Sequence, residues 1–128
     1  MRVLLDTHAF LWAITGDSRL SPLAQRLFLD SRNVLLLSAA SIWEIAIKVR
    51  IGKLPLPQPS ARYLGEQLSR NAIEVLPVEA SHALRLFELP DIHRDPFDRL
   101  LVAQCQVEGL PLVTGDAHLR QYAVETLW

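Results

Sequence analysis

Short runs of apolar residues alternate along the chain with longer segments that carry helix signals. Each run is only a few residues long and ends at polar or turn-forming residues, as strands of a buried sheet do. We therefore predict strands at residues 2–5, 34–37, 73–76 and 112–114, and a weaker one at 124–126.

Helix start and stop signals fill the segments between these runs. Ser21 before Pro22 is a typical N-cap with proline at the first helical position, and Gly52 and Gly109 stand where helices would end. Helices are predicted at residues 9–14, from 22 onward, from a cap at Ser38 or Ser41 to about 50, at 61–70, 79–87, 98–108 and 117–122. The proline-rich stretch 53–59 is too short to separate two domains, so residues 1–128 are predicted to form a single domain.

Apolar strands that alternate with helices indicate an α/β fold, with a parallel sheet covered on both faces. In such folds functional residues gather beyond the carboxyl ends of the strands. Asp6 and Asp116 each follow a predicted strand, so both should lie at that edge. Asp98 opens a helix, and it reaches the same edge only if the preceding loop brings it there.

Composition narrows the class of protein. Half of the 128 residues are hydrophobic and 21% are charged, as in a globular chain. The net charge of −1 provides no bulk attraction for nucleic acid, so such binding needs a local basic patch or metal ions. Polar residues from Asp6 onward argue against a signal peptide, and no apolar run is long enough for a transmembrane helix. The single Cys105 excludes an internal disulfide and fits a reducing cytoplasm.

Most of the acidic residues at these positions also have a structural explanation. Asp95 before Pro96 has the position of a helix N-cap, which is the better-supported role for this residue. Asp98, at the third helical position, can favour the helix dipole and still point at a metal. Asp116 can cap the last short helix. Asp6 is the hardest to explain structurally, because it interrupts an apolar run at a strand end.

Glu44 has two structural explanations of its own. It could complete a capping box with Ser41, or pair with Lys48 four residues further on. Its helix, however, is apolar around most of its circumference. A carboxylate on so apolar a helix is costly unless it is paired or bound to a metal, which favours a role as ligand.

Carboxylates at these positions point to a divalent metal site. Mg²⁺ and Mn²⁺ prefer hard oxygen ligands, and without a metal clustered carboxylates repel one another. The histidine spacing fits no zinc motif, and the chain has no phosphate-binding glycine loop and no nucleophile elbow. Arg94 and Arg99 flank the acidic pair Asp95 and Asp98, so they are candidates for phosphate contact.

Several stretches of the sequence resemble PIN-domain toxins of the VapC type. The resemblance extends from Val3 to about Tyr122, and its motifs occur in the family's order. They are Asp6-Thr7-His8, residues 43–48 (WEIAIK), residues 52–55 (GKLP), residues 95–104 (DPFDRLLVAQ) and residues 112–116 (LVTGD).

The resemblance implies a three-layer α/β/α sandwich around a parallel sheet of about five strands in the order 3-2-1-4-5. It implies a Mg²⁺- or Mn²⁺-dependent endoribonuclease, the toxin of a toxin–antitoxin pair. The acidic positions of the family carry over to Asp6, Glu44, Asp98 and Asp116, while Asp95 and Thr114 are possible secondary site residues. The family also implies a homodimer, and an antitoxin whose C-terminal segment covers the active site.

Two other function classes remain as alternatives. A receiver-type signalling domain also has a doubly wound fold and a Mg²⁺-binding acidic cluster. It would need paired acids after the first strand and a lysine after the last, and the chain has neither. A non-catalytic PIN-like binding module usually lacks some of the acids, all four of which are present here.

Overall fold

The computed structural model describes all residues, 1–128, and contains one parallel sheet of five strands in the order β3-β2-β1-β4-β5. The strands are β1 (Arg2–Leu5), β2 (Val34–Ser38), β3 (Ile73–Leu76), β4 (Leu112–Val113) and β5 (Thr126–Leu127). The predicted parallel sheet and its strand order are confirmed.

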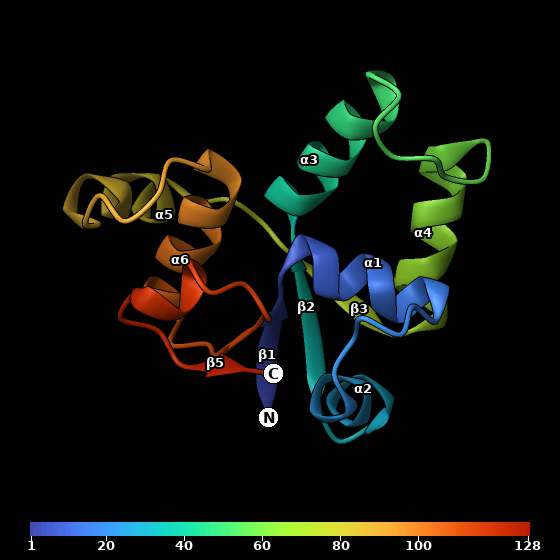
Figure 1. Cartoon of the computed structure of the whole chain (residues 1–128), viewed down its shortest axis with the longest axis horizontal. Helices are drawn as coiled ribbons and strands as arrows, with labels where there is room; N and C mark the ends of the chain where they lie inside the picture. Colours follow the sequence, from blue (N-terminus) through green and yellow to red (C-terminus); the bar gives the residue numbers. More distant parts are fainter.

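Helices cover both faces of this sheet, as Figure 1 shows, so the predicted three-layer architecture is also confirmed. Those on one side are α1 (Thr7–Thr15), α2 (Pro22–Leu29), α3 (Ala39–Arg50) and α4 (Ser60–Arg70). Those on the other side are α5 (Ala80–Arg85) and α6 (Pro96–Glu108), with the short 3-10 helices η1 (Leu86–Glu88) and η2 (Leu119–Gln121). None of these helices is long and apolar enough to span a membrane.

Strand alternation divides the apolar residues between two cores. Val3 and Leu5 of β1 point into the core under α1, α2 and α4, whereas Leu4 between them points into the core under α6. Both faces of β1 are buried, which is why its sequence is a continuous apolar run. Cys105 is buried in the second core, and burial raises the pKa of its thiol to about 12.

Some element boundaries differ from the prediction. Helix α1 begins at Thr7 rather than at residue 9, because Asp6 caps it directly after β1. Helix α3 is capped by Ser38, which settles the choice between Ser38 and Ser41. The helix predicted at 117–122 is only the 3-10 turn η2, and the last strand lies at 126–127 rather than 124–126.

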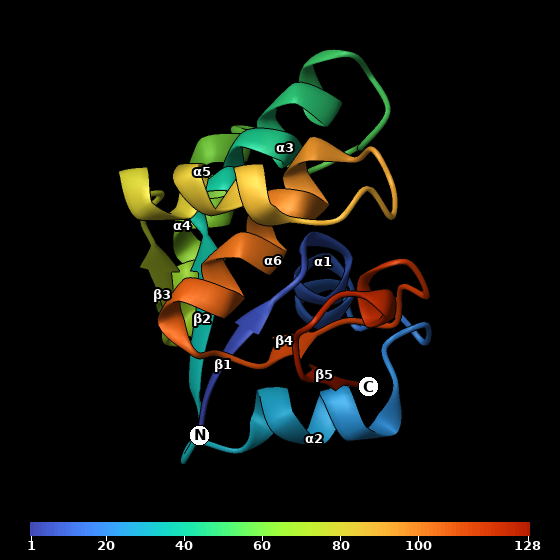
Figure 2. The ribbon, with the colours of Figure 1, turned by 90° about the vertical axis from the view of Figure 1, so that its left-hand side faces the viewer.

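The carboxyl ends of β1 and β2 point toward the start of α1 and toward α3, as Figure 2 shows. The loop before α6 and the segment after β4 lie on the same side of the molecule in this view. This arrangement brings acidic residues from four distant parts of the sequence toward one edge of the sheet.

Candidate functional site

Asp6 lies at the carboxyl end of β1 and caps α1. Its Oδ1 accepts a hydrogen bond of 2.6 Å from the Ala9 amide, and its own amide donates to the Val113 carbonyl at 3.0 Å. Asp6, the acid hardest to explain structurally from the sequence, therefore does have a structural role, because an aspartate between a strand and a helix can cap the exposed amides. Capping occupies one carboxylate oxygen and leaves the other available to a ligand.

Burial raises the pKa of the Asp6 carboxyl above its usual value. Hydrogen bonds from the Thr114 hydroxyl and the Ala9 amide act against this shift, and the charge of Asp116 adds to it. Only 6% of Asp6 is exposed. A cation at this position would lower the free energy of the ionised form.

Asp116 follows β4 and faces the same space as Asp6. Its Oδ1 accepts a hydrogen bond of 2.8 Å from the His118 amide, and its own amide donates to Oγ1 of Thr114 at 3.1 Å. Thr114 is fully buried. Its hydroxyl thus contacts both acidic residues and holds them in place, which makes it a positioning group at this edge.

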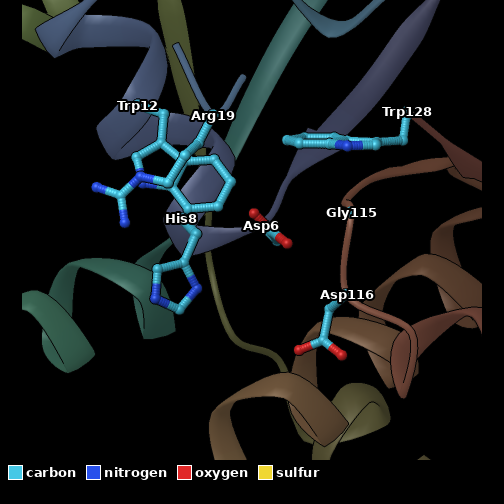
Figure 3. A pocket seen from close by; sticks show the side chains of 7 residues that line it. All are labelled: Asp6, His8, Trp12, Arg19, Gly115, Asp116 and Trp128. Carbon is cyan, nitrogen blue, oxygen red and sulfur yellow. The ribbon is translucent and has the colours of Figure 1, made fainter. Parts of the chain in front are cut away.

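Asp6 and Asp116 line one open pocket of about 460 Å³. Figure 3 shows the two carboxylates directed into it, below the indole of Trp128. The remaining lining residues are His8, Trp12, Arg19 and Gly115. Both aspartates thus lie at the predicted edge of the sheet, where they line a pocket that is open to solvent.

Asp98 lies in the first turn of α6, next to the capping residue Asp95. Oδ1 of Asp95 accepts hydrogen bonds from the amides of Phe97 at 2.9 Å and Asp98 at 3.1 Å, so the predicted capping role of Asp95 is confirmed. Burial raises the pKa of the Asp98 carboxyl to about 6, and the charge of Asp95 adds to the shift. The charges of Asp116 and Glu44 raise it further, against a hydrogen bond with His93.

Two histidines connect Asp98 with Asp116. Nε2 of His93 lies 3.2 Å from Oδ2 of Asp98, and Nδ1 of His118 lies 3.3 Å from Oδ1 of Asp116. The two imidazoles stack with their centroids 5.3 Å apart and their planes 5° from parallel. Nδ1 of His93 also lies 2.8 Å from the Tyr122 hydroxyl. The loop before α6 and the segment after β4 are therefore joined beside the acidic pocket.

Glu44 is buried in α3, although Trp43 and Ile47 on the same helix are exposed. Its Oε2 pairs with Nζ of Lys48 at 2.8 Å, while its buried Oε1 has no hydrogen-bond partner. The capping-box alternative is excluded because α3 begins at Ala39, which places Ser41 inside the helix. The Lys48 alternative is confirmed, but it accounts for one carboxylate oxygen only.

The two arginines near Asp98 differ in their surroundings. Nη1 of Arg99 donates to the Pro90 carbonyl at 2.7 Å and to the Tyr122 hydroxyl at 3.1 Å. It thereby ties the loop before α6 to η2. Arg94 is exposed. Of the two, Arg94 is the better placed for phosphate contact.

The structure does not gather three acidic, histidine or cysteine side chains closely enough to form a closed metal site. It does bring Asp6 and Asp116 into one pocket and places Asp98 and Glu44 within electrostatic reach of one another. The donors fit Mg²⁺ or Mn²⁺ in type, because they are carboxylate oxygens and one of them is buried without a partner. The repulsion among them is what a divalent cation would relieve.

Sequence reasoning did not single out His93, His118, Trp12 and Trp128 as residues of this region. The histidines were set aside because their spacing fits no zinc motif, yet each lies within five residues of an acidic site residue. That proximity was the available signal. The two tryptophans come from opposite ends of the sequence, and only the fold brings them together.

Comparison with known proteins shows the family to which this chain belongs. The sequence model of the PIN domain matches residues 3–125. The chain belongs to the PIN domain family. The expected family is thus confirmed, and this PIN domain covers nearly the whole chain.

Relatives of this PIN domain differ in how similar they are to it and in how much of the chain the similarity covers. It is 31% identical to the ribonuclease VapC22 of Mycobacterium tuberculosis over 94% of this chain and 91% of that protein. It is 53% identical to the ribonuclease VapC16 of the same organism, over a local match of 41% of this chain and 38% of that protein. Among solved structures, VapBC2 from Rickettsia felis bound to a promoter DNA fragment matches with a TM-score of 0.74 and 18% identity. That match covers 99% of this chain and 98% of the other.

Proposed function

We propose that this protein is a metal-dependent endoribonuclease, the toxin of a toxin–antitoxin pair. The observation that carries the proposal is the set of carboxylates at this edge of the sheet. Asp6 and Asp116 line the open pocket. Burial raises the pKa of the nearby Asp98 to about 6, and the charges of Asp95, Asp116 and Glu44 add to that rise. Its nearly full-length similarity to the ribonuclease VapC22 supports an RNA substrate.

The four acids act as oxygen ligands for Mg²⁺ or Mn²⁺. Asp6 and Asp116 offer carboxylate oxygens to the pocket, Asp98 approaches from α6, and Glu44 offers its unpartnered Oε1. A bound divalent cation lowers the pKa of coordinated water and offsets negative charge on a phosphodiester.

The chain's own groups hold this arrangement in place. The Ala9 amide orients Asp6, Thr114 and the His118 amide orient Asp116, and His93 orients Asp98. Three of the four acids are therefore held in place by neighbouring groups of the protein. This order reduces the loss of side-chain freedom when the ligands close around a cation.

A cognate antitoxin, a homodimer and a cytoplasmic location are part of the proposal. The matched Rickettsia felis structure is a VapBC complex, which supports a protein partner. Exposed Trp43, Ile47 and Ile51 on and after α3 offer an apolar contact surface. The free, buried Cys105 agrees with a reducing compartment.

The receiver-type alternative has no support from the family match, which is to the PIN domain. A non-catalytic PIN-like module is the alternative that an experiment must exclude. It predicts RNA that remains intact in the presence of metal.

The test is cleavage of pooled RNA by the purified protein with Mn²⁺, with EDTA, and with the variant Asp98→Asn. We expect cleavage with Mn²⁺ that EDTA and the substitution both remove. Intact RNA in all three reactions, with the protein free of antitoxin and no binding of Mn²⁺, would contradict the proposal. Cleavage that persists in EDTA would contradict its metal dependence.

A further inference from the structure

One wall of the acidic pocket consists of rings and a guanidinium group. The indoles of Trp12 and Trp128 lie 5.9 Å apart between centroids, and His8 lies 5.6 Å from Trp12. The guanidinium carbon of Arg19 lies 4.9 Å from the centroid of the Trp12 ring. This aromatic wall (His8, Trp12, Arg19 and Trp128) faces the same space as the Asp6 and Asp116 carboxylates (Figure 3).

Trp128 is held against the backbone of Gly115. A Cβ atom added to Gly115 would lie 2.5 Å from Cε2 of the indole, so no larger residue fits there without moving the ring. The glycine directly precedes Asp116, which couples the ring's position to an acidic site residue. Figure 3 shows the indole edge-on, with one face directed toward the carboxylates.

Arg19 is fixed by a two-bond pair with Asp17. Its Nε donates to Oδ1 at 3.1 Å and its Nη2 to Oδ2 at 2.8 Å. The pair lowers the pKa of Asp17 to about 2. The guanidinium thus lies over the Trp12 ring with its charge balanced by the Asp17 carboxylate.

A second pocket of about 360 Å³ continues from this wall. It shares His8, Trp12 and Arg19 with the acidic pocket and is also lined by Lys48 and Lys53. Lys48 is paired with Glu44, whereas Lys53 is exposed. Asp17 lines this pocket too and pairs with Arg19, so Lys53 is the basic side chain there that is in no ion pair. A path therefore leads from the carboxylates, past the rings, to Lys53.

We propose that the aromatic wall is a base-binding subsite for single-stranded RNA. The nucleobase beside the cleaved phosphodiester stacks on the part of the Trp128 indole that lines the acidic pocket, and the phosphates that follow it run toward Arg19 and Lys53. The inference rests on the proposed ribonuclease function and adds the side chains of this chain that hold a base beside the cut. Flat rings interleaved with cations suit this ligand, because every base has a face that stacks on an aromatic ring.

The test compares Trp128→Leu, Trp128→Phe and the wild type on a pool of short random-sequence RNA with Mn²⁺. The readouts are KM, kcat and the base composition on each side of the cut, obtained by sequencing the products. Trp128→Leu should raise KM by roughly 5- to 100-fold and flatten the base preference at one position. Trp128→Phe should have a KM and a base preference close to those of the wild type, because it keeps an aromatic face.

Phe87→Leu is the matched control, since it removes an exposed ring on η1 that lines neither pocket. It should change neither KM nor base preference. Thermal melts show whether each variant is folded. If Trp128→Leu is folded and has the KM and base preference of the wild type, the inference is overturned while the ribonuclease function stands. A uniform loss of kcat with the preference intact would also overturn it.

Lys53→Gln tests the phosphate path. It should weaken binding equally for all sequences and reduce the salt dependence of KM, on a double-logarithmic plot, by a slope of about 1. An unchanged salt slope would remove Lys53 from the path. If the wild type cleaves no RNA at all, the ribonuclease proposal fails and the subsite fails with it.

Discussion

Two clusters of buried polar groups in the molecule differ in how their groups are paired. Between α5 and α6, fully buried His82 accepts the Glu79 amide at its Nδ1, 2.9 Å away, and its Nε2 lies 3.0 Å from Oε1 of Glu108. Gln104 beside it donates to the Pro77 carbonyl at 3.2 Å. Donors face acceptors here, and only the uncharged amide oxygen of Gln104 is left unpartnered.

At the sheet edge, by contrast, carboxylates face carboxylates. Burial raises the pKa of both Asp98 and Asp6; the charges of Asp95, Asp116 and Glu44 add to the shift of Asp98, and the charge of Asp116 adds to that of Asp6. The unpartnered atom there is a carboxylate oxygen of Glu44. The first cluster is almost complete within the protein, whereas the function proposed above has a cation complete the second. We therefore expect substitutions in the first cluster to change stability and substitutions in the second to change binding and cleavage.

Asp6→Asn should have the largest effect of the substitutions predicted here, a loss of RNA cleavage without a loss of stability. Asparagine also caps helices well, so α1 should remain intact while the site loses a charged ligand. RNA cleavage should fall by about 100-fold or more, with thermal stability in EDTA equal to or above that of the wild type. Asp30→Asn, which removes the exposed partner of Arg32, is the control and should cleave normally. Full activity in Asp6→Asn would exclude this residue from the mechanism.

His82→Leu should lower stability and leave RNA cleavage unchanged. It leaves the Glu79 amide without its acceptor and breaks the contact with Glu108, which should lower the free energy of unfolding by about 2–4 kcal/mol. Well below its melting temperature the variant should cleave RNA as the wild type does. Urea unfolding and cleavage assays measure the two effects. A loss of kcat with unchanged stability would contradict the structural role of this cluster.

The Asp98 carboxyl should have a smaller effect, which is to make the stability of the metal-free protein in EDTA depend on pH. Its pKa is about 6 in the folded protein against a usual 3.8, so the folded state binds this proton more tightly. Stability should therefore fall by about 1–3 kcal/mol as pH rises from 4 to 7. Asp98→Asn should reduce that slope and raise the melting temperature near neutral pH by about 3 °C. A clear decrease would mean that the favourable contact with the helix dipole outweighs the repulsion.

Sequence patterns were sufficient for the order of the elements and for the approach of Asp6 and Asp116. Apolar runs mark the strands, and a parallel sheet brings residues that follow its strands to one edge. The early start of α1 was missed because the capping role of Asp6 was not recognised. The position of Glu44 was harder to predict, since α3 buries this residue and exposes the apolar Trp43 and Ile47.

Contacts between distant segments could not be predicted. The stacking of His93 on His118 depends on how the loop before α6 packs against η2. The contact of Trp12 with Trp128 depends on how the end of β5 passes over Gly115. Neither follows from local periodicity, because each is decided by tertiary packing. These are also the contacts that shape the pocket around the acids.

The most direct test of a cation-completed site is the thermal melt of the protein in EDTA and in Mn²⁺. Binding to the folded state alone stabilises it by about 2.7 kcal/mol at a concentration 100 times Kd, so Mn²⁺ should raise the wild-type melting temperature by several degrees. The rise should be much smaller in Asp6→Asn and unchanged in His82→Leu. A wild-type melting temperature that is the same in EDTA and in millimolar Mn²⁺ would contradict the account.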